Sequence, residues 1–372
     1  METLLLEIGT EEIPAGYIKP ALDALAATMR KMMAESRIEH GSAKIYGTPR
    51  RLAVRIENVA VKQRPMKTEL TGPPVKVGLD ATGKPTMAAE KFAEKAGVKI
   101  SQLSVKETPK GAYLCALKKE RGQATRTLLK DILPKAILAT PFPKTMRWAD
   151  QDISFARPIH SCLALLGSKI ITLKLGNVNA NRYTNGHYFM NPARIKIDSA
   201  DDYIRRLKGA QVIIDLDERR KAVESEIAAA AKRAGGSILP DKELVDIVTN
   251  LVEYPVAVAG EFDKEFLELP DEPLITAMRE HQKYFAISDS AGKLMPCFIA
   301  VNNTIAKDMD LVATGHQRVI RARLADAERA GVRQGVVEPL FQKAGAAAGD
   351  VHHFAHHVGV HPLHEILEVE ID

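Results

Sequence analysis

Leu4-Leu5-Leu6-Glu7-Ile8 is a short apolar run near the start of the chain, and Glu-Glu-Ile-Pro-Ala-Gly at 11–16 follows it as a turn. Apolar side chains then recur at helical spacing, namely Leu22, Leu25, Met29, Met32 and Met33. After a second turn at 46–51, residues 52–61 alternate in the manner of a strand. The chain is therefore predicted to open with a strand, a helix and a strand, and its methionines are assigned to the core rather than to a ligand site.

Beyond this unit the pattern keeps alternating after one long interruption. Residues 62–86 hold four prolines and three glycines, which predicts a long surface loop. Helices are expected at 87–96, 124–139, 218–233 (capped by Asp217) and 242–252, and strands at 111–117, 159–166, 170–175, 212–215 and 255–259. This order predicts an α/β to α+β fold, with mixed sheets and flanking helices in two modules, 1–140 and 141–328. A poorly ordered, His-rich tail is expected at 329–372.

The composition is that of an ordinary globular protein, with 45% hydrophobic and 27% charged residues in a chain of 372. Lys and Arg outnumber Asp and Glu by only 52 to 47, so net charge alone does not indicate a polyanionic partner. Three cysteines, far apart in apolar surroundings, favour reduced and buried thiols. The first residues lack the basic stretch of a secretory signal, and no apolar run approaches the roughly 18–20 residues of a membrane span. We expect a cytoplasmic protein without a membrane partner.

Sequence signatures of an autonomous catalyst are missing. The chain has neither His-Ile-Gly-His nor Lys-Met-Ser-Lys-Ser, and it lacks Gly-x-Ser-x-Gly, His-Glu-x-x-His and cysteine pairs with metal spacing. Residues 78–84 match the spacing of a phosphate loop, but Pro85 stands where a Ser or Thr should follow the lysine, which favours a simple turn. Aspartates between 198 and 217 lie beside turns and helix starts, where capping explains them better than acid/base chemistry. No catalytic residue and no metal ligand is therefore assigned.

Three turn-like segments combine a cation with an aromatic or histidine ring: 144–148, 182–189 and 279–284. Cations bind phosphates and planar rings stack on exposed bases, so this grouping suits a folded RNA better than duplex DNA. The helix expected at 318–328 adds two arginines on one side. The RNA-contact candidates are Arg147, Arg182, His187, Arg279, Lys283, Arg318 and Arg321. Alternatively, the rings pack beneath arginine stems, and the helix arginines pair with Asp326 or Glu328.

Six short phrases occur along the chain in a fixed order. They are Glu-Ile-Gly-Thr-Glu-Glu-Ile-Pro at 7–14, Thr-Pro-Arg-Arg-Leu at 48–52, Phe-Pro-Lys-Thr-Met-Arg-Trp-Ala-Asp at 142–150, Leu-Val-Glu-Tyr-Pro at 251–255, His-Gln-Lys-Tyr-Phe at 281–285 and Arg-Val-Ile-Arg-Ala-Arg-Leu-Ala-Asp-Ala-Glu at 318–328. This series resembles the beta subunit of bacterial heterotetrameric glycyl-tRNA synthetase. The resemblance covers about 1–328, nearly nine tenths of the chain.

The resemblance implies a role without chemistry of its own. In that family the beta subunit grips tRNA, while a separate class II alpha subunit activates glycine with ATP and transfers it to the tRNA 3′ end. It thus implies a noncatalytic, tRNA-binding subunit of glycine–tRNA ligase in protein biosynthesis, whose partners are the alpha subunit and tRNA(Gly) in an alpha-two, beta-two assembly. No cofactor is expected on this chain, since ATP and Mg are used by the alpha subunit. Family members continue into helical and anticodon-binding regions, so this chain resembles their N-terminal half.

The chain departs from the family pattern at three short motifs and in its last residues. The family's Arg-Pro-Ile-Arg-Trp ends here in His160 and Ser161. Its Gly-His-Arg-Phe has Tyr188 in place of the arginine. Its Gly-Asn-Glu-Arg has His316 and Gln317 in place of Asn-Glu. Two of these changes remove an arginine, which lowers the expected affinity for RNA. After Glu328 the family pattern stops.

The last 21 residues hold six histidines, in i, i+4 pairs such as His352 with His356 and His353 with His357. A zinc site and adventitious metal affinity are both compatible with this spacing. We favour a shifted reading frame or a gene truncation as the source of this tail, which translation of the gene in its other frames would test.

Two other functions stay open at this level. The chain could act alone as a hydrolase on mischarged tRNA or a small ester, with His187 or His281 as general base. It could also be a nonfunctional, truncated paralogue that binds the alpha subunit unproductively.

Overall fold

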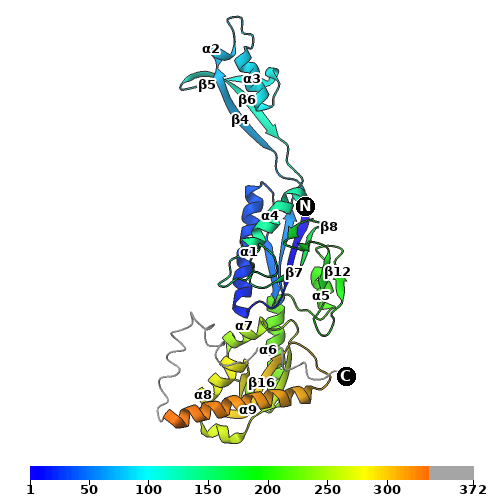
Figure 1. The fold of residues 1–372 in the computed structure, drawn as a ribbon, viewed down its shortest axis with the longest axis vertical. Helices are drawn as coiled ribbons and strands as arrows, with labels where there is room; N and C mark the ends of the chain where they lie inside the picture. The colour runs from blue at the N-terminus through cyan, green and yellow to red at the C-terminus, as the bar shows by residue number, and fades with distance from the viewer. Residues whose placement is uncertain (335–372) are drawn as a thin grey trace. The chain divides into compact units, whose positions relative to one another are not determined.

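A computed structural model describes the backbone of residues 1–334 and the side chains of residues 1–326. This part of the chain forms two compact units, one of residues 1–230, 240–258 and 301–307, and one of residues 231–239, 259–300 and 308 onward (Figure 1). The mixed fold class of sheets with flanking helices is confirmed. The compact units do not follow the expected boundary near residue 140, because the strand at 159–166 pairs with the N-terminal strand. Of the tail expected at 329–372, residues 329–334 continue the last helix, and the histidines lie outside the described residues.

The first unit is built on a five-stranded antiparallel sheet in the order β2-β3-β1-β7-β8. Its strands are β1 (Glu2–Thr10), β2 (Ala43–Thr48), β3 (Arg51–Val59), β7 (Ile159–Leu166) and β8 (Lys169–Ile170). Leu6 of the central strand lies opposite Val54 on one side and Ala164 on the other. The strand, helix and strand expected at the start of the chain are confirmed, and the apolar run 4–8 forms the middle of the sheet.

Alternation along β1 sends its side chains into two different layers. Leu6 and Ile8 belong to a core that also contains the buried faces of helices α1 (Ala15–Glu35) and α4 (Thr125–Leu138). Leu5 points to the opposite face and packs with Tyr203 of helix α5 (Tyr203–Lys208). Glu7 is on that same face and is 2% exposed, so the one charged side chain of the run lies inside a buried layer.

The segment expected to be a long loop contains a strand instead. Residues 66–120 form a three-stranded sheet, β4-β6-β5, with helices beside it; the elements are β4 (Met66–Pro74), α2 (Val75–Gly78), α3 (Met87–Ala96), η1 (Ile100–Gln102), β5 (Leu103–Thr108) and β6 (Gly111–Glu120). Alternate residues of β4 are half-buried, and Leu70 pairs with Ala116 of β6. The loop prediction for 62–86 is therefore wrong over β4. Its prolines lie before the strand and at its end, where an edge strand tolerates the missing N–H groups.

Four short strands and two helices follow. They are β9 (Lys174–Leu175), β10 (Val178–Asn179), β11 (Tyr183–Asn185), β12 (Arg194–Lys196), α6 (Leu216–Arg233) and α7 (Lys242–Thr249), and α6 runs from the first unit into the second. The strand expected at 170–175 is split between β8 and β9, and the one expected at 212–215 does not form. The cap of α6 is Asp215 rather than Asp217, since its carboxylate accepts the N–H groups of Asp217 and Glu218 at 3.0 Å each.

The second unit contains a four-stranded sheet in the order β13-β15-β16-β14. The strands are β13 (Ser237–Ile238), β14 (Val256–Glu261), β15 (Phe285–Ser288) and β16 (Leu294–Asn302), and the helices are η2 (Lys264–Glu268), α8 (Asp271–Thr276), η3 (Ala277–Gln282) and α9 (Met309–Gln334). The helix expected at 318–328 lies within α9 and is confirmed.

Two further expectations concern the thiols and the membrane. Cys115, Cys162 and Cys297 are free and buried, as predicted, and burial raises the pKa of the Cys162 thiol to about 12. Within residues 1–334, no helix combines the length and the apolar character required to cross a membrane.

The close approach of α1 to β2 predicts a sensitive glycine. A Cβ on Gly47 would lie 2.7 Å from Leu22 Cδ1 and 3.0 Å from Ile18 Cγ2, so Gly47→Ala should lower the free energy of unfolding by about 1–3 kcal/mol. Gly16→Ala is the matched control, because a Cβ there meets nothing within 4 Å and its effect should be neutral or stabilising by up to about 1 kcal/mol. Urea unfolding followed by the fluorescence of Trp148, which packs against this core, measures both. Equal stability of Gly47→Ala and wild type would contradict the packing.

Candidate functional site

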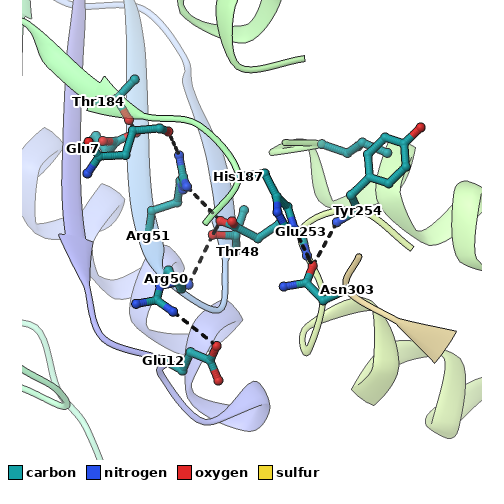
Figure 2. Close-up of polar contacts among 12 residues, drawn as sticks. Glu7, Glu12, Thr48, Arg50, Arg51, Thr184, His187, Glu253, Tyr254 and Asn303 are labelled. Atoms are coloured by element: carbon teal, nitrogen blue, oxygen red, sulfur yellow. Dashed lines mark hydrogen bonds and ion pairs between the residues drawn. The ribbon is translucent and has the colours of Figure 1, made fainter. Parts of the chain in front are cut away.

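A buried ion pair lies where the first two family-like phrases and the fourth come together in space (Figure 2). Arg51, at the start of β3, is 5% exposed, and its Nη2 lies 2.9 Å from Oε1 of Glu253, which is 1% exposed. The same oxygen accepts a hydrogen bond of 2.7 Å from Thr48 Oγ1 at the end of β2. Arg51 Nη1 donates to the carbonyl of Asn185 at 2.9 Å. Burial by itself lowers the pKa of Arg51, but the carboxylates of Glu253 and Glu7 outweigh it and the pKa is raised, so the guanidinium stays charged.

Glu7 forms the second half of this polar layer. Its Oε2 accepts a hydrogen bond of 3.0 Å from Thr184 Oγ1 and another from the Tyr203 hydroxyl. Burial and the charge of Glu7 raise the pKa of Tyr203 well above its usual value, so the hydroxyl keeps its hydrogen and acts as a donor. The carboxylate is thus held by two neutral donors in addition to the nearby Arg51 charge.

His187 connects the polar layer to a neighbouring loop rather than to solvent. The ring is fully buried, and Nδ1 accepts the N–H groups of Phe189 and Met190 at 3.3 Å each. That leaves Nε2 to carry the hydrogen and donate to Asn303 Oδ1 at 3.2 Å. The same Oδ1 accepts the backbone N–H of Glu253 at 2.6 Å, so His187 and Asn303 together fix the loop that presents Glu253 (Figure 2).

A pocket of about 430 Å³ opens beside this layer and is lined entirely by the first unit. Its lining includes Glu7, Gly9, Thr10, Glu11, Arg50, Arg51, His160, Tyr188 and Glu253. His160 Nε2 donates to Glu11 Oε1 at 2.8 Å, while Arg50 reaches Glu11 Oε2 at 3.1 Å. The Arg50 guanidinium also lies 4.4 Å from the centroid of the Tyr188 ring. Three positions at which the chain departs from the family motifs, His160, Ser161 and Tyr188, therefore line the pocket.

Two buried oxygens of pocket-lining residues lack hydrogen-bond partners among the described residues. These are Thr10 Oγ1, in a residue 3% exposed, and Glu253 Oε2. Buried polar atoms are nearly always paired in native proteins, so these two oxygens are exceptions. Arg219 Nη2 is a buried donor that also lacks a partner among the described residues, and the charge of its guanidinium acts on Glu253.

The seven RNA-contact candidates fall in both compact units. In the first unit Arg147 is exposed, Arg182 is half-buried with Nη2 donating to the Ser168 carbonyl at 3.1 Å, and His187 is buried. In the second unit Arg318 is exposed, while Arg321 pairs with Asp263 at 2.9 Å. The side chain of Glu328, an alternative partner, lies outside the described residues. Arg279 and Lys283 both pair with Glu280. Exposed guanidinium groups are thus found at 147, 318 and 321, the last of them in an ion pair, whereas the His187 ring has no exposed face for a base.

Two rings of these segments pack in apolar surroundings rather than beneath an arginine stem. Trp148 packs against the core of the first unit, and Tyr284 is 4% exposed, stacked on Phe298 at 4.6 Å. Tyr188 and Phe189 are the exception, since each is 53% exposed and the two rings meet edge to face at 4.9 Å. Residues 78–84 form a turn in which Asp80 accepts the N–H of Lys84 at 2.9 Å, in agreement with the rejected phosphate-loop reading.

The sequence reasoning did not select the residues that build the pocket. Glu7, Arg51 and Glu253 all lie within the quoted phrases, yet none was named as a candidate. The available signal was Glu7 itself, an acidic residue inside an apolar strand pattern, which requires a buried partner.

Comparison with known proteins relates the chain to translation. Residues 4–329 match the family model described as glycyl-tRNA synthetase beta subunit. The glycine–tRNA ligase beta subunit of Desulfatibacillum aliphaticivorans is 55% identical over 328 residues, covering 88% of this chain and 48% of the relative. That of Desulforapulum autotrophicum is 54% identical over 328 residues, with the same two shares, and that of Myxococcus xanthus is 47% identical over 323 residues, covering 87% and 46%. The chain spans about half the length of the curated relatives it matches.

A double-mutant cycle measures the buried pair. Arg51→Met and Glu253→Gln should each lower the free energy of unfolding by about 3–5 kcal/mol, because each leaves the other partner unpaired in a buried layer. The loss of unfolding free energy in the double variant should be smaller than the sum of the two single losses by at least about 1 kcal/mol. The exposed Lys19–Asp23 pair on α1, at 2.7 Å, is the control, and its coupling should stay below about 0.5 kcal/mol. Equal coupling in the two cycles would contradict the assignment.

Proposed function

This chain belongs to the glycyl-tRNA synthetase beta subunit family, and on that premise we propose that it is a noncatalytic, tRNA-binding subunit of glycine–tRNA ligase, or the N-terminal part of one. The observation that carries the proposal is the family match over 4–329 together with the pocket, where the phrases at 7–14, 48–52 and 251–255 meet. Glycine activation and transfer are assigned to a separate alpha subunit, which uses ATP and Mg. The assembly is alpha-two, beta-two, and it acts in the cytoplasm.

A binding role fits the way in which the polar side chains are engaged. Arg51 is held by Glu253 and by the Asn185 carbonyl, and Glu7 by Thr184 and Tyr203. His187, the residue considered as a hydrolytic base, uses both ring nitrogens within the chain. Side chains that are held by such partners keep a binding surface in place, whereas a general base needs a nitrogen that reaches its substrate.

The RNA contacts belong to the exposed and half-exposed cations. We assign phosphate contacts to Arg147 and Arg182 in the first unit and to Arg279, Lys283, Arg318 and Arg321 in the second. His187 acts instead as a positioning residue for the loop that carries Glu253. The absence of family-type arginines at His160 and Tyr188 predicts weaker RNA binding than in members that keep them, because each lost phosphate contact reduces the electrostatic contribution.

Reconstitution tests the proposed division of labour. The purified chain alone should form no glycyl-tRNA, whereas the chain mixed with an alpha subunit and tRNA(Gly) should give a complex detectable by mass and glycylation above that of the alpha subunit alone. A catalytically disabled alpha subunit serves as the control, since it should restore the complex but not the glycylation. Glycylation by the isolated chain, or no complex with tRNA under any of these conditions, would overturn the proposal.

Salt dependence of tRNA(Gly) binding tests the assigned cations. Arg147→Ala and Arg318→Ala should each reduce the slope of log K against log salt by about 0.7–0.9, the contribution of one phosphate contact. Lys19→Ala is the matched control, because it removes one exposed positive charge from α1, outside the assigned contacts, and should leave the slope unchanged. Equal slopes for all three variants and the wild type would remove Arg147 and Arg318 from the interface.

A further inference from the structure

Positive charge is concentrated in one part of the chain, residues 62–124, which contain the sheet β4-β6-β5 and its helices. We call this part the basic module. It holds 13 lysines and arginines against 6 aspartates and glutamates, whereas the other 309 residues hold 39 against 41. All 13 cations are exposed, and those in ion pairs among the described residues are Arg64, Lys106 and Lys118. The basic module therefore carries the whole positive surplus of the chain.

The helices of the basic module cover one face of its sheet. A Cβ on Gly72 of β4 would lie 2.5 Å from the Phe92 ring of α3, and one on Gly78 of α2 would lie 2.3 Å from Leu114 of β6. Side chains alternate along a strand, so the covered face is that of Leu114 and Ala116. The opposite face, which we call the open face, presents the exposed side chains of Lys67, Glu69, Lys106, Leu117 and Lys119.

Two lysines lie directly opposite each other on the open face. Lys67 of the edge strand β4 is in register with Lys119 of the central strand β6. Neither ammonium group has an ion-pair partner among the described residues. Like charges at opposite positions destabilise a sheet, and a lysine that protects a sheet edge from pairing accounts only for Lys67. An anion that contacts both ammonium groups relieves this repulsion.

The carboxylate that the strands place on the open face is already neutralised. Glu69 lies opposite Leu117 and forms an ion pair with Lys106. On the covered face Lys118 pairs with Glu120 at 3.3 Å, so the strand cation of that face is compensated as well. Two uncompensated positive charges therefore remain on the open face, at Lys67 and Lys119.

We propose that the open face of the β4-β6-β5 sheet binds the phosphate backbone of tRNA, with Lys67 and Lys119 each contacting a phosphate. The inference rests on the proposed tRNA-binding function and assigns it a surface outside the cations named above. An RNA strand carries a charge at every nucleotide, and lysine binds phosphate as a point charge. The ten exposed cations of the basic module without an ion pair suit such an extended polyanion better than one acidic patch of a protein.

Removal of the two lysines tests this surface. Labelled tRNA(Gly) is titrated with the 372-residue chain at a series of salt concentrations. Lys67→Gln/Lys119→Gln should reduce the slope of log K against log salt by about 1.4–1.8, the contribution of two phosphate contacts. The midpoint of urea unfolding should not fall, because the variant removes a like-charge pair.

Lys91→Gln/Lys95→Gln is the matched control. These two lysines are also exposed neighbours without an ion pair among the described residues, but they lie on α3, which packs on the covered face. The slope of the control should match that of the wild type. An equal reduction in both double variants would show that only the overall charge matters, and would overturn the assignment to the open face.

Glu69→Gln provides a gain of binding that misfolding cannot imitate. It removes the carboxylate of the open face and frees Lys106, so the affinity for tRNA(Gly) should rise at least about twofold. Wild-type binding that neither Glu69→Gln nor Lys67→Gln/Lys119→Gln alters would overturn this inference and leave the proposed function intact. Loss of alpha-subunit binding with unchanged tRNA affinity would identify a protein contact instead. A wild-type chain that binds no tRNA would overturn both.

Discussion

The buried contact between Arg51 and Glu253 is the constraint from which the candidate site follows. It joins the start of β3 to a loop some two hundred positions later in the chain, at a place where neither charge is exposed to water. Taking two charges out of water is costly, and the cost is met only if each retains good partners. The Thr48 hydroxyl donates to Glu253, and the Asn185 carbonyl accepts from Arg51. His187 and Asn303 fix the loop that carries Glu253. The pocket is therefore a consequence of how one ion pair is accommodated.

The side chains around the buried pair hold one another in position, and none of them is assigned a chemical step. The polar side chains around Glu7 and Arg51 hold one another, and the two oxygens left over are acceptors, which bind donors but do not by themselves break bonds. Exposed cations at 147 and 318 lie on loop and helix surfaces instead of in the pocket. The proposed RNA-binding surface and the pocket account for the two sets of residues without assigning either a catalytic step.

Local patterns in the sequence predicted the elements well and the site poorly. The helix at 87–96 and the strand at 159–166 were predicted to the residue, because capping, period and flanking turns all act within a few positions. Strand β4 was missed because its prolines lie at its ends, where they do not interrupt the pairing. The expected strand at 212–215 does not form, although Ile213 and Ile214 make single backbone hydrogen bonds to Glu253 and Gly47. His187 was taken as an RNA contact, although it is buried. Its role depends on Asn303, more than a hundred residues away, and no local pattern reveals such a partner.

Hydrogen–deuterium exchange on Glu253→Gln tests most directly whether the buried pair organises the site. If it does, amide exchange will rise together at 46–52, 184–190 and 250–255, the three segments that the pair and its hydrogen bonds connect, while β4 and β6 keep their wild-type protection. Exchange that rises only at 250–255 would show that the loop is held independently of Arg51, and would contradict the central role of this contact.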